Sequence, residues 1–256
     1  MTRQLPDFDT HEFAHKSTDF AVAVFCINEN GKLLEQLEKM QALEGCPDII
    51  VADGGSTDGS TEHEKLKTRG VNTLLVKTGS GKLGAQMRMA FAYALDRGYK
   101  GLVVIDGNGK DGCEAIADFV RLLENGYDHV QGSRFIPGGI SENLPFSRWL
   151  GVKLLHAPLM SVTSGFHHTD TTNGFRSYSR KLLEDPRLDI FRDVFEGYEL
   201  HYYLARQAAR LGFAVTETPV ARRYPATGPL PSKISPIRGN ANVLRKLFTV
   251  CAGRYD

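Results

Sequence analysis

Two polar residues, Asp106 and Asn108, directly follow a short apolar run and could together hold a metal ion. Side chains two residues apart on an extended segment point to the same side, so both can reach one small target. A hard cation such as Mg²⁺ is typically held by one or two carboxylates together with the phosphates of a substrate. Asp and Asn between glycines are also favoured in tight turns for backbone reasons. The stretch therefore predicts either a metal site or a turn.

The apolar run before Asp106 is one of several that alternate with amphipathic segments. Short β-branched runs closed by glycine or polar residues predict buried strands, and apolar residues three or four apart predict helices. Strands that alternate with helices imply an α/β fold whose mostly parallel central sheet is flanked by helices. The predicted strands are 20–27, 48–52, 71–76, 101–106, 129–132 and 214–220, and the predicted helices are 33–40, 60–69, 87–95, 116–123 and 198–211.

Polar residues and glycines gather where these predicted strands end. Ligands of parallel sheets bind outside the carboxyl ends of the strands, so this concentration predicts a binding site. No Gly-x-Gly-x-x-Gly follows the first strand, and Leu83 stands where a phosphate loop needs Ser or Thr, so both nucleotide fingerprints are missing. The clusters are Asn28-Glu29, 53–58 with Asp53 and Asp58, 78–82 with Lys82, 106–108, and 132–134 with Arg134.

A length of 256 residues fits one large domain or two small ones. We expect one domain, 19–235, between a lead-in, 1–18, and a basic amphipathic C-terminal helix, 236–256. From residue 221 onward seven basic residues stand against one acidic residue. This asymmetry indicates either a face for a phosphate-bearing partner or anionic surface, or simply a solvated end. Residues 141–166 are apolar and predict short amphipathic helices that lie on a membrane surface or close over the sheet.

The four cysteines show neither disulfide nor metal-ligand spacing, and no signal peptide or long apolar run is visible. We therefore expect a cytoplasmic protein, at most peripheral on the cytoplasmic face of a membrane. The net charge of +1 gives no reason to expect a nucleic-acid partner.

Taken in chain order, these motifs resemble the family 2 glycosyltransferases of the GT-A fold, and within them the dolichol-phosphate mannose synthase-like branch. The sequence departs from that family at Phe25, where the family has proline, and at Gly54, where many members have a second Asp. Asn108 stands in place of a second metal carboxylate. The matching blocks are Asn28-Glu29, 51–60 (VADGGSTDGS), Asp106-Gly-Asn108, 132–134 (GSR), 173–176 (NGFR), 217–220 (ETPV) and Ser232-Lys233.

The resemblance implies an inverting transfer of a sugar from a nucleoside-diphosphate sugar to an acceptor, assisted by Mg²⁺ or Mn²⁺. Asp53 would contact the base or ribose of the donor, with Asp58 supporting its loop. Asp106 and Asn108 would hold the cation on the diphosphate. The phosphate of a polyprenyl-phosphate acceptor would be bound by Arg134 and Arg148, and the other nucleotide-binding candidates are Asn28, Glu29, Lys82, Arg223 and Lys233.

The nature of the acceptor decides whether the reaction needs a general base. A phosphate monoester has its second pKa near ~6, so at neutral pH it is already a nucleophile and needs only cations, which arginine supplies well. A sugar hydroxyl of a growing polysaccharide or glycan would need a carboxylate base, for which Asp170, Glu196 and Glu199 are candidates.

We expect the lipid phosphate, because of the paired arginines, the apolar segment 141–166 and the basic C-terminal end. The alternatives are transfer to a sugar hydroxyl, and a non-catalytic module that binds nucleotide sugars, which the missing second carboxylate would allow. A sugar nucleotidyltransferase would need a glycine-rich loop with an arginine after the first strand, and residues 26–30 (CINEN) do not resemble one.

Overall fold

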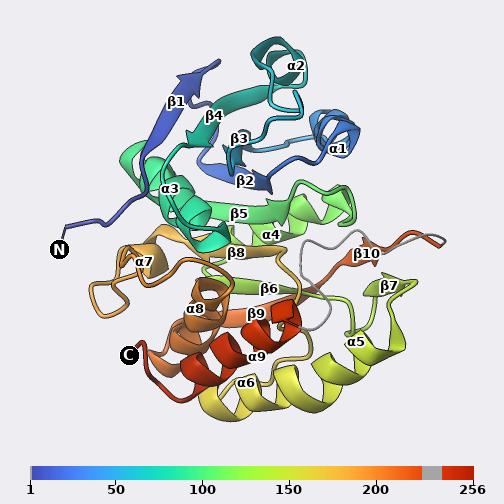
Figure 1. Cartoon of the computed structure of the whole chain (residues 1–256), viewed down its shortest axis with the longest axis vertical. Helices are drawn as coiled ribbons and strands as arrows, with labels where there is room; N and C mark the ends of the chain where they lie inside the picture. Colours follow the sequence, from blue (N-terminus) through green and yellow to red (C-terminus); the bar gives the residue numbers. More distant parts are fainter. Residues whose placement is uncertain (1, 227–237) are drawn as a thin grey trace.

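The computed structural model describes residues 2–226 and 238–256. Its centre is an eight-stranded sheet (Figure 1). The strand order is β1-β4-β3-β2-β5-β8-β6-β9. The neighbours β4, β3, β2 and β5 are parallel, as are β6 and β9, whereas β1 and β8 run antiparallel to their neighbours. The strands are β1 (Phe8–Glu12), β2 (Phe20–Cys26), β3 (Asp48–Asp53), β4 (Val71–Lys77), β5 (Gly101–Asp106), β6 (His129–Ser133), β8 (Arg176–Ser179) and β9 (Val215–Pro219).

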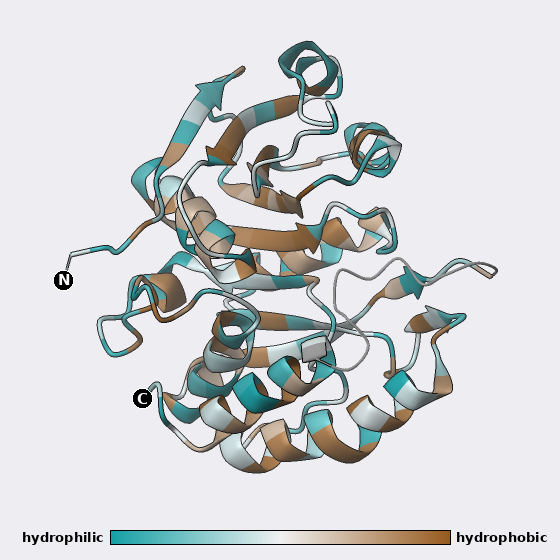
Figure 2. Ribbon diagram, viewed as in Figure 1, coloured by the Kyte–Doolittle hydropathy of each residue, from teal (hydrophilic) through white to brown (hydrophobic). Residues whose placement is uncertain are grey.

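The central strands form because every one of their positions is covered. All seven residues of β2 and all six of β3 are buried, which is typical of parallel strands packed on both faces. Successive side chains alternate between the faces, so Ala21 and Ala23 join one core while Val22 and Val24 join the other. Figure 2 shows the hydrophobic residues concentrated in these strands. The predicted α/β fold with a helix-flanked sheet is confirmed.

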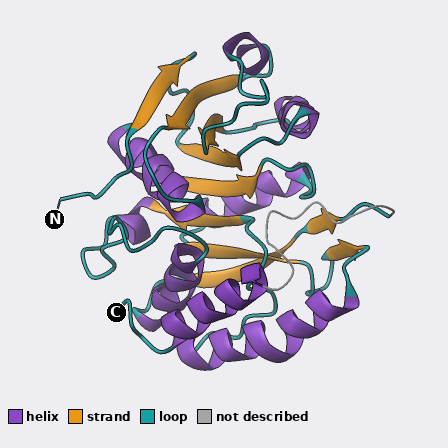
Figure 3. Cartoon of the chain, in the orientation of Figure 1, coloured by secondary structure: helices purple, strands orange, loops and turns teal. Residues whose placement is uncertain are grey.

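Two layers of helices cover the sheet. One core includes residues of α1 (Gly31–Gln41), α2 (His63–Lys67) and α4 (Ile116–Glu124). The other includes residues of α3 (Leu83–Asp96), α8 (Glu199–Arg210) and the terminal helix α9 (Arg238–Cys251). Residues 146–164 form three consecutive helical segments, which lie along the rim of the molecule in Figure 3. They are α5 (Phe146–Gly151), a π-helical turn η2 (Val152–His156) and α6 (Ala157–Ser164), and the short α7 (Arg180–Leu183) and the 3-10 turn η1 (Cys113–Ala115) complete the helices.

A second, two-stranded sheet lies beside the carboxyl ends of the parallel strands. It pairs β7 (Ile140–Glu142) with β10 (Ala221–Arg223) in parallel. The loop after β5 is bonded to it, because Gly112 N–H donates to Ala221 O and Arg223 N–H donates to Lys110 O, both at 2.9 Å. In Figure 1 the arrowheads of β2 and β5 point toward this small sheet. The small sheet therefore closes one side of the edge where the sequence predicts a site.

The strands β1, β7, β8 and β10 were not predicted from the sequence. Their polar compositions hide them: β1 reads FDTHE, and β8 reads RSYS although it lies between β5 and β6. The division of the chain at residues 18 and 235 stays a prediction, and its second boundary lies outside the described residues. Within residues 2–226 and 238–256, no helix combines the length and the hydropathy that crossing a bilayer requires.

Candidate active site

The carboxylate of Asp106, at the end of β5, faces the guanidinium of Arg222 from β10. Arg222 Nη2 lies 3.3 Å from Asp106 Oδ2, and Arg222 Nη1 lies 2.5 Å from Asp111 Oδ2. Asp111 is fully buried, and burial together with the charge of Asp106 raises the pKa of Asp111 although Arg222 opposes this. Burial disfavours the charge of Arg222, but the two carboxylates hold its pKa above the ordinary value. One cation thus joins two carboxylates at the end of β5.

Asn108 lies beside Asp106, as predicted, but its amide is turned so that the nitrogen faces the carboxylate. Asn108 Nδ2 donates to Asp106 Oδ2 at 3.4 Å, and Asn108 Oδ1 accepts from the backbone N–H of Lys110 at 3.3 Å. The opposite amide orientation would put oxygen against oxygen and N–H against N–H, so the contacts favour this one. Among the described residues, no group of three or more His, Cys, Asp or Glu side chains could hold a metal ion.

Four cations surround the buried ring of Tyr224, just after β10. Arg134 Nη1 donates to the Tyr224 hydroxyl at 3.2 Å. The charged groups of Arg222, Lys110 and Arg148 lie 5.8, 5.9 and 6.0 Å from the centroid of the ring. Cations within about 6 Å of an aromatic face are attracted to it. We call these four residues the cation cluster, and such a cluster suits phosphate groups.

Arg134 and Asp170 form a buried ion pair within this site. Arg134 Nε lies 2.6 Å from Asp170 Oδ2, Arg134 Nη2 lies 3.0 Å from Asp170 Oδ1, and Nη2 also donates to Thr172 Oγ1. Burial opposes the charge of Asp170, but Arg134 holds the pKa of that carboxyl below its ordinary value. Glu217 supports the same loop by accepting from the N–H groups of Thr169 and Asp170. The predicted roles of Arg134 on an acceptor phosphate and of Asp170 as a base stay predictions.

Arg148, on α5, is half-buried and makes no salt bridge to any described residue. It meets Arg134 at Tyr224, so the two arginines that the sequence paired do approach one ring. Tyr198, just before α8, borders the same place. Tyr198 is 37% exposed as a residue, but desolvation of its hydroxyl and the charge of Asp106 raise its pKa to about 12, and Arg222 and Arg148 oppose this shift.

Glu199, the first residue of α8, is completely buried. Its Oε1 accepts from the backbone N–H groups of Glu196 and Gly197 at 2.7 and 2.8 Å, and its Oε2 pairs with Lys246 of α9. Glu199 therefore ties the start of α8 to the terminal helix, and its use as a base stays a prediction. The side chain of Glu196 is exposed.

The predicted nucleotide loop is held together by its own polar residues. Asp53 is buried and accepts from the backbone N–H and the hydroxyl of Ser56, the latter at 2.6 Å. Asn28 Oδ1 accepts from the backbone N–H of Thr57 at 2.8 Å. Asp58 Oδ2 accepts from the backbone N–H of Asn30 at 2.7 Å. Burial alone would raise the pKa of Asp58, but hydrogen bonds from Ser60 and Asn30 hold it below its ordinary value. These contacts join the loops after β2 and β3, and a nucleotide contact stays a prediction.

Gly54 has a local reason for its departure from the family pattern. The buried side chain of Gln86, from α3, donates to the carbonyl oxygens of Cys26 and Ala52 at 2.9 and 3.0 Å. A Cβ atom on Gly54 would lie 3.1 Å from Gln86 Nε2. The glutamine therefore fills the space where another family member would carry a side chain.

The remaining predicted nucleotide contacts lie in different surroundings. Lys82 is exposed at the start of α3. Glu29 is half-buried in the loop after β2, and its charge opposes the lowering of the pKa of Lys110 by burial. Arg223 is exposed and pairs with Glu142 at 3.1 Å, outside the cation cluster. Lys233 lies outside the described residues.

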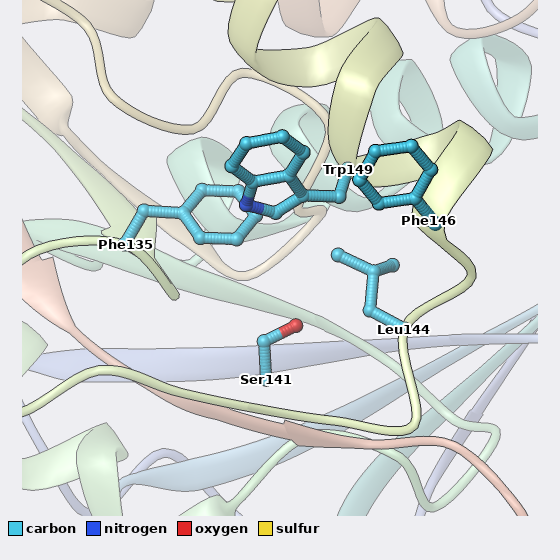
Figure 4. A pocket seen from close by; sticks show the side chains of 5 residues that line it. All are labelled: Phe135, Ser141, Leu144, Phe146 and Trp149. Atoms are coloured by element: carbon cyan, nitrogen blue, oxygen red, sulfur yellow. The ribbon is translucent and has the colours of Figure 1, made fainter.

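Figure 4 shows an apolar pocket of about 440 Å³. The ring of Phe135, which lines it, lies with its centroid 5.0 Å from the guanidinium carbon of Arg134 in the cation cluster. The pocket is formed by α5 and the segments before it, and α5 also carries Arg148. Further apolar side chains are exposed along the same helical segments, with Phe146 73%, Leu154 69% and Val162 83% exposed. The pocket is lined by Phe135, Ser141, Leu144, Phe146 and Trp149.

Sequence reasoning missed Lys110, Asp111, Arg222 and Tyr224. The one available signal was that neighbouring residues of a strand point to opposite faces, so only one of Arg222 and Arg223 could face the site. Choosing between them requires the contact of β10 with the loop after β5, where residue 222 bridges to Asp111.

Comparison with curated proteins shows several relatives. The chain is 32% identical over 183 residues to the polyprenol monophosphomannose synthase of Mycolicibacterium smegmatis. This alignment covers 68% of the chain and 67% of that protein. The chain is 31% identical over 180 residues to the undecaprenyl-phosphate mannosyltransferase of Micrococcus luteus, covering 68% of the chain and 70% of that protein. A glycosyltransferase of Haloferax volcanii, AglJ, is 27% identical to the chain over 208 residues, and this alignment covers 80% of the chain and 63% of that protein. No family model matches the chain.

Solved structures show the same fold at lower identity. Glucosyl-3-phosphoglycerate synthase from Mycobacterium tuberculosis, in complex with Mn²⁺, UDP and glucosyl-3-phosphoglycerate, aligns with a TM-score of 0.62 at 17% identity. The alignment covers 91% of the chain and 80% of that structure. The same enzyme with Mn²⁺, UDP and phosphoglyceric acid aligns with a TM-score of 0.64.

Proposed function

Because the chain belongs to the family 2 glycosyltransferases of the dolichol-phosphate mannose synthase type, we propose that it transfers a sugar from a nucleoside-diphosphate sugar to a polyprenyl phosphate. Mannose is the sugar we propose, since the two relatives are named polyprenol monophosphomannose synthase and undecaprenyl-phosphate mannosyltransferase. The observation that carries the proposal is the cation cluster around Tyr224, at the carboxyl edge of the sheet.

In the proposed reaction, an oxygen of the acceptor phosphate attacks the anomeric carbon of the donor sugar. The bond from that carbon to the diphosphate breaks, and its electron pair leaves with the diphosphate. One displacement inverts the anomeric carbon. Because a phosphate monoester is largely ionised at neutral pH, with a second pKa near ~6, the protein need not remove a proton. It must instead supply positive charge to two groups, the incoming phosphate and the departing diphosphate.

The contacts of the candidate bases support a phosphate acceptor over a sugar hydroxyl. A hydroxyl acceptor needs a carboxylate within hydrogen-bond reach. Both oxygens of Asp170 are bonded to Arg134, and Glu199 is buried against Lys246. Neither Asp170 nor Glu199 is available to an acceptor unless those ion pairs break, which leaves the exposed Glu196 as the remaining candidate base for a hydroxyl acceptor.

Arg148 and its surroundings support the lipid part of the proposal. This arginine lies on α5, whose neighbouring side chains line the apolar pocket of Figure 4. A planar guanidinium suits a phosphate, and an exposed apolar helix face suits the first isoprene units attached to it. Contact with a membrane surface through α5 and α6 is part of the same proposal.

A divalent cation, Mg²⁺ or Mn²⁺, stays a prediction for this chain. In its favour, the tuberculosis enzyme of the same fold is named in complex with Mn²⁺ and UDP. The residues here fit such an ion poorly, because Asp106 already pairs with Arg222 and Asn108 turns its nitrogen toward that carboxylate. No step of the proposed mechanism therefore passes through a metal ion.

The proposal is tested by incubating the purified chain with labelled nucleoside-diphosphate mannose and a detergent-dispersed polyprenyl phosphate. We expect labelled lipid, and we expect Arg148→Ala to raise KM for the lipid phosphate by roughly ten- to a hundredfold while KM for the donor stays near the wild-type value. Arg121→Ala, which removes an exposed arginine of α4, serves as the control and leaves both constants unchanged. Absence of labelled lipid contradicts the function, and an unchanged KM in Arg148→Ala contradicts the assigned acceptor site.

A further inference from the structure

Two cationic side chains, Arg222 and Lys110, lie near the end of β5, where the family resemblance predicts a metal ion. Arg222 contacts both Asp106 and Asp111, and Lys110 follows Asn108 in the same loop. Lys110 is half-buried, and its burial and the charge of Arg222 lower its pKa, while Asp106 and Glu29 oppose this shift. Arg222 therefore contacts the carboxylate that would bind a metal, and Lys110 meets Arg222 at the ring of Tyr224, whose centroid lies 5.9 Å from the Lys110 ammonium and 5.8 Å from the Arg222 guanidinium.

The negative charge at this place is already balanced. Two carboxylates, Asp106 and Asp111, stand against the charges of Arg222 and Lys110, and Glu29 and Lys32 add one charge of each sign near Lys110. A divalent cation that approached Asp106 would meet a guanidinium 3.3 Å away and the charge of Lys110 in the same loop. Like charges in a partly buried site repel strongly, so this set of residues suits an anion better than a second cation.

The two contacts of Arg222 differ in a way that suits anion binding. Its Nη1 donates to the fully buried Asp111, which holds the guanidinium in place. Its contact with Asp106 is longer, at 3.3 Å, and Asp106 itself is partly exposed. A guanidinium has five N–H donors, so Arg222 can turn an N–H toward a phosphate while Asp111 continues to hold it.

We propose that Lys110 and Arg222 bind the donor's diphosphate directly, and that sugar transfer by this chain does not require a divalent cation. This inference rests on the proposed glycosyltransferase function and deepens it. As the bond from the anomeric carbon to the diphosphate oxygen breaks, the electron pair stays on that oxygen. The two cations stabilise the charge that develops there. No proton is transferred, and Asp111 acts as the positioning residue for Arg222.

Binding and activity in the presence of a chelator test the proposal. Calorimetric titration of the chain with a nucleoside diphosphate in excess EDTA should give nearly the same affinity as in Mn²⁺, and transfer should retain at least about half its rate. Lys110→Gln should weaken binding in EDTA by roughly ten- to a hundredfold, the effect of losing a charge-assisted hydrogen bond. Lys100→Gln is the matched control, because Lys100 is exposed directly before β5, at the end of that strand away from the site. We expect no change in nucleotide affinity for this variant.

A double variant, Asn108→Asp with Lys110→Gln, adds a test that measures a gain of metal binding, whereas Lys110→Gln alone measures a loss of nucleotide binding. It replaces a cation by neutral and acidic oxygen ligands, so we expect Mn²⁺ binding, followed by paramagnetic resonance, to become measurable and nucleotide binding to become Mn²⁺-dependent. Loss of wild-type nucleotide binding in EDTA, with recovery in Mn²⁺, would overturn the inference. If nucleotide binds in EDTA but no lipid product forms under any condition, the proposed function fails while the inference on diphosphate binding stands.

Discussion

The buried pair of Arg134 and Asp170 allows a quantitative test of the site's construction. Their side chains are 2% and 0% exposed, so replacing Asp170 by Asn leaves the Arg134 charge without a compensating carboxylate in the interior. Breaking a buried ion pair by removing one partner costs roughly 3–5 kcal/mol. For a protein of this size, each kcal/mol lowers Tm by about 2–4 °C, so Asp170→Asn should lower Tm by about 6–20 °C.

Urea unfolding of three variants checks this reasoning. Asp118→Asn, which breaks an exposed pair with Arg121, is the control and should cost at most ~1 kcal/mol. The double variant Arg134→Met with Asp170→Leu should recover most of the lost stability, because apolar residues can replace a buried pair without leaving a charge behind. The account of this pair is refuted if Asp170→Asn unfolds within ~1 kcal/mol of the wild type.

Two further predictions concern pH and the space around Asp106. Burial lowers the pKa of His129 and His168 to about 3 and that of His201 well below 6.5, so these rings stay neutral in the fold and bind protons when the chain unfolds. The contribution of these rings to the free energy of unfolding is therefore fully present above pH 6.5. It falls by up to about 1.4 kcal/mol per pH unit for each ring as the pH drops from 6.5 toward 3. Calorimetry at pH 7.5, 6 and 5 that shows a constant Tm contradicts this. A Cβ at Gly174 would lie 3.3 Å from Asp106 Oδ1, so Gly174→Ala should lower kcat by about tenfold through displacement of that carboxylate, with under ~1 kcal/mol lost in urea unfolding, and an unchanged kcat speaks against a role for Asp106.

The sequence predicted the parallel strands because burial on both faces gives a recognisable apolar run, as in β2 and β5. It did not predict β8, whose polar residues have tertiary partners. Arg176 is almost fully buried, and its guanidinium donates to the carbonyl oxygens of Thr171, Asn173 and His201. Such a strand forms because its polar groups are satisfied by distant segments, which local propensity does not reveal.

The sequence predicted the edge of the sheet and the carboxylate of Asp106, because polar residues at strand ends mark both. It named Arg223 and not the adjacent Arg222 as a nucleotide contact, and that role of Arg223 stays a prediction. The pairing of Arg222 with Asp111 and that of Arg223 with Glu142 depend on how β10 docks against β5's loop and β7. Contacts between segments so far apart in the chain decide which arginine faces inward.

The identity of the nucleophile tests the central claim most directly. Labelled nucleoside-diphosphate mannose would be offered with a polyprenyl phosphate and, in parallel, with the same polyprenol lacking the phosphate. The account predicts labelled lipid with the phosphate alone, formed together with an equal amount of nucleoside diphosphate. Equal labelling of the polyprenol, or nucleoside diphosphate release that ignores the added lipid phosphate, would contradict it.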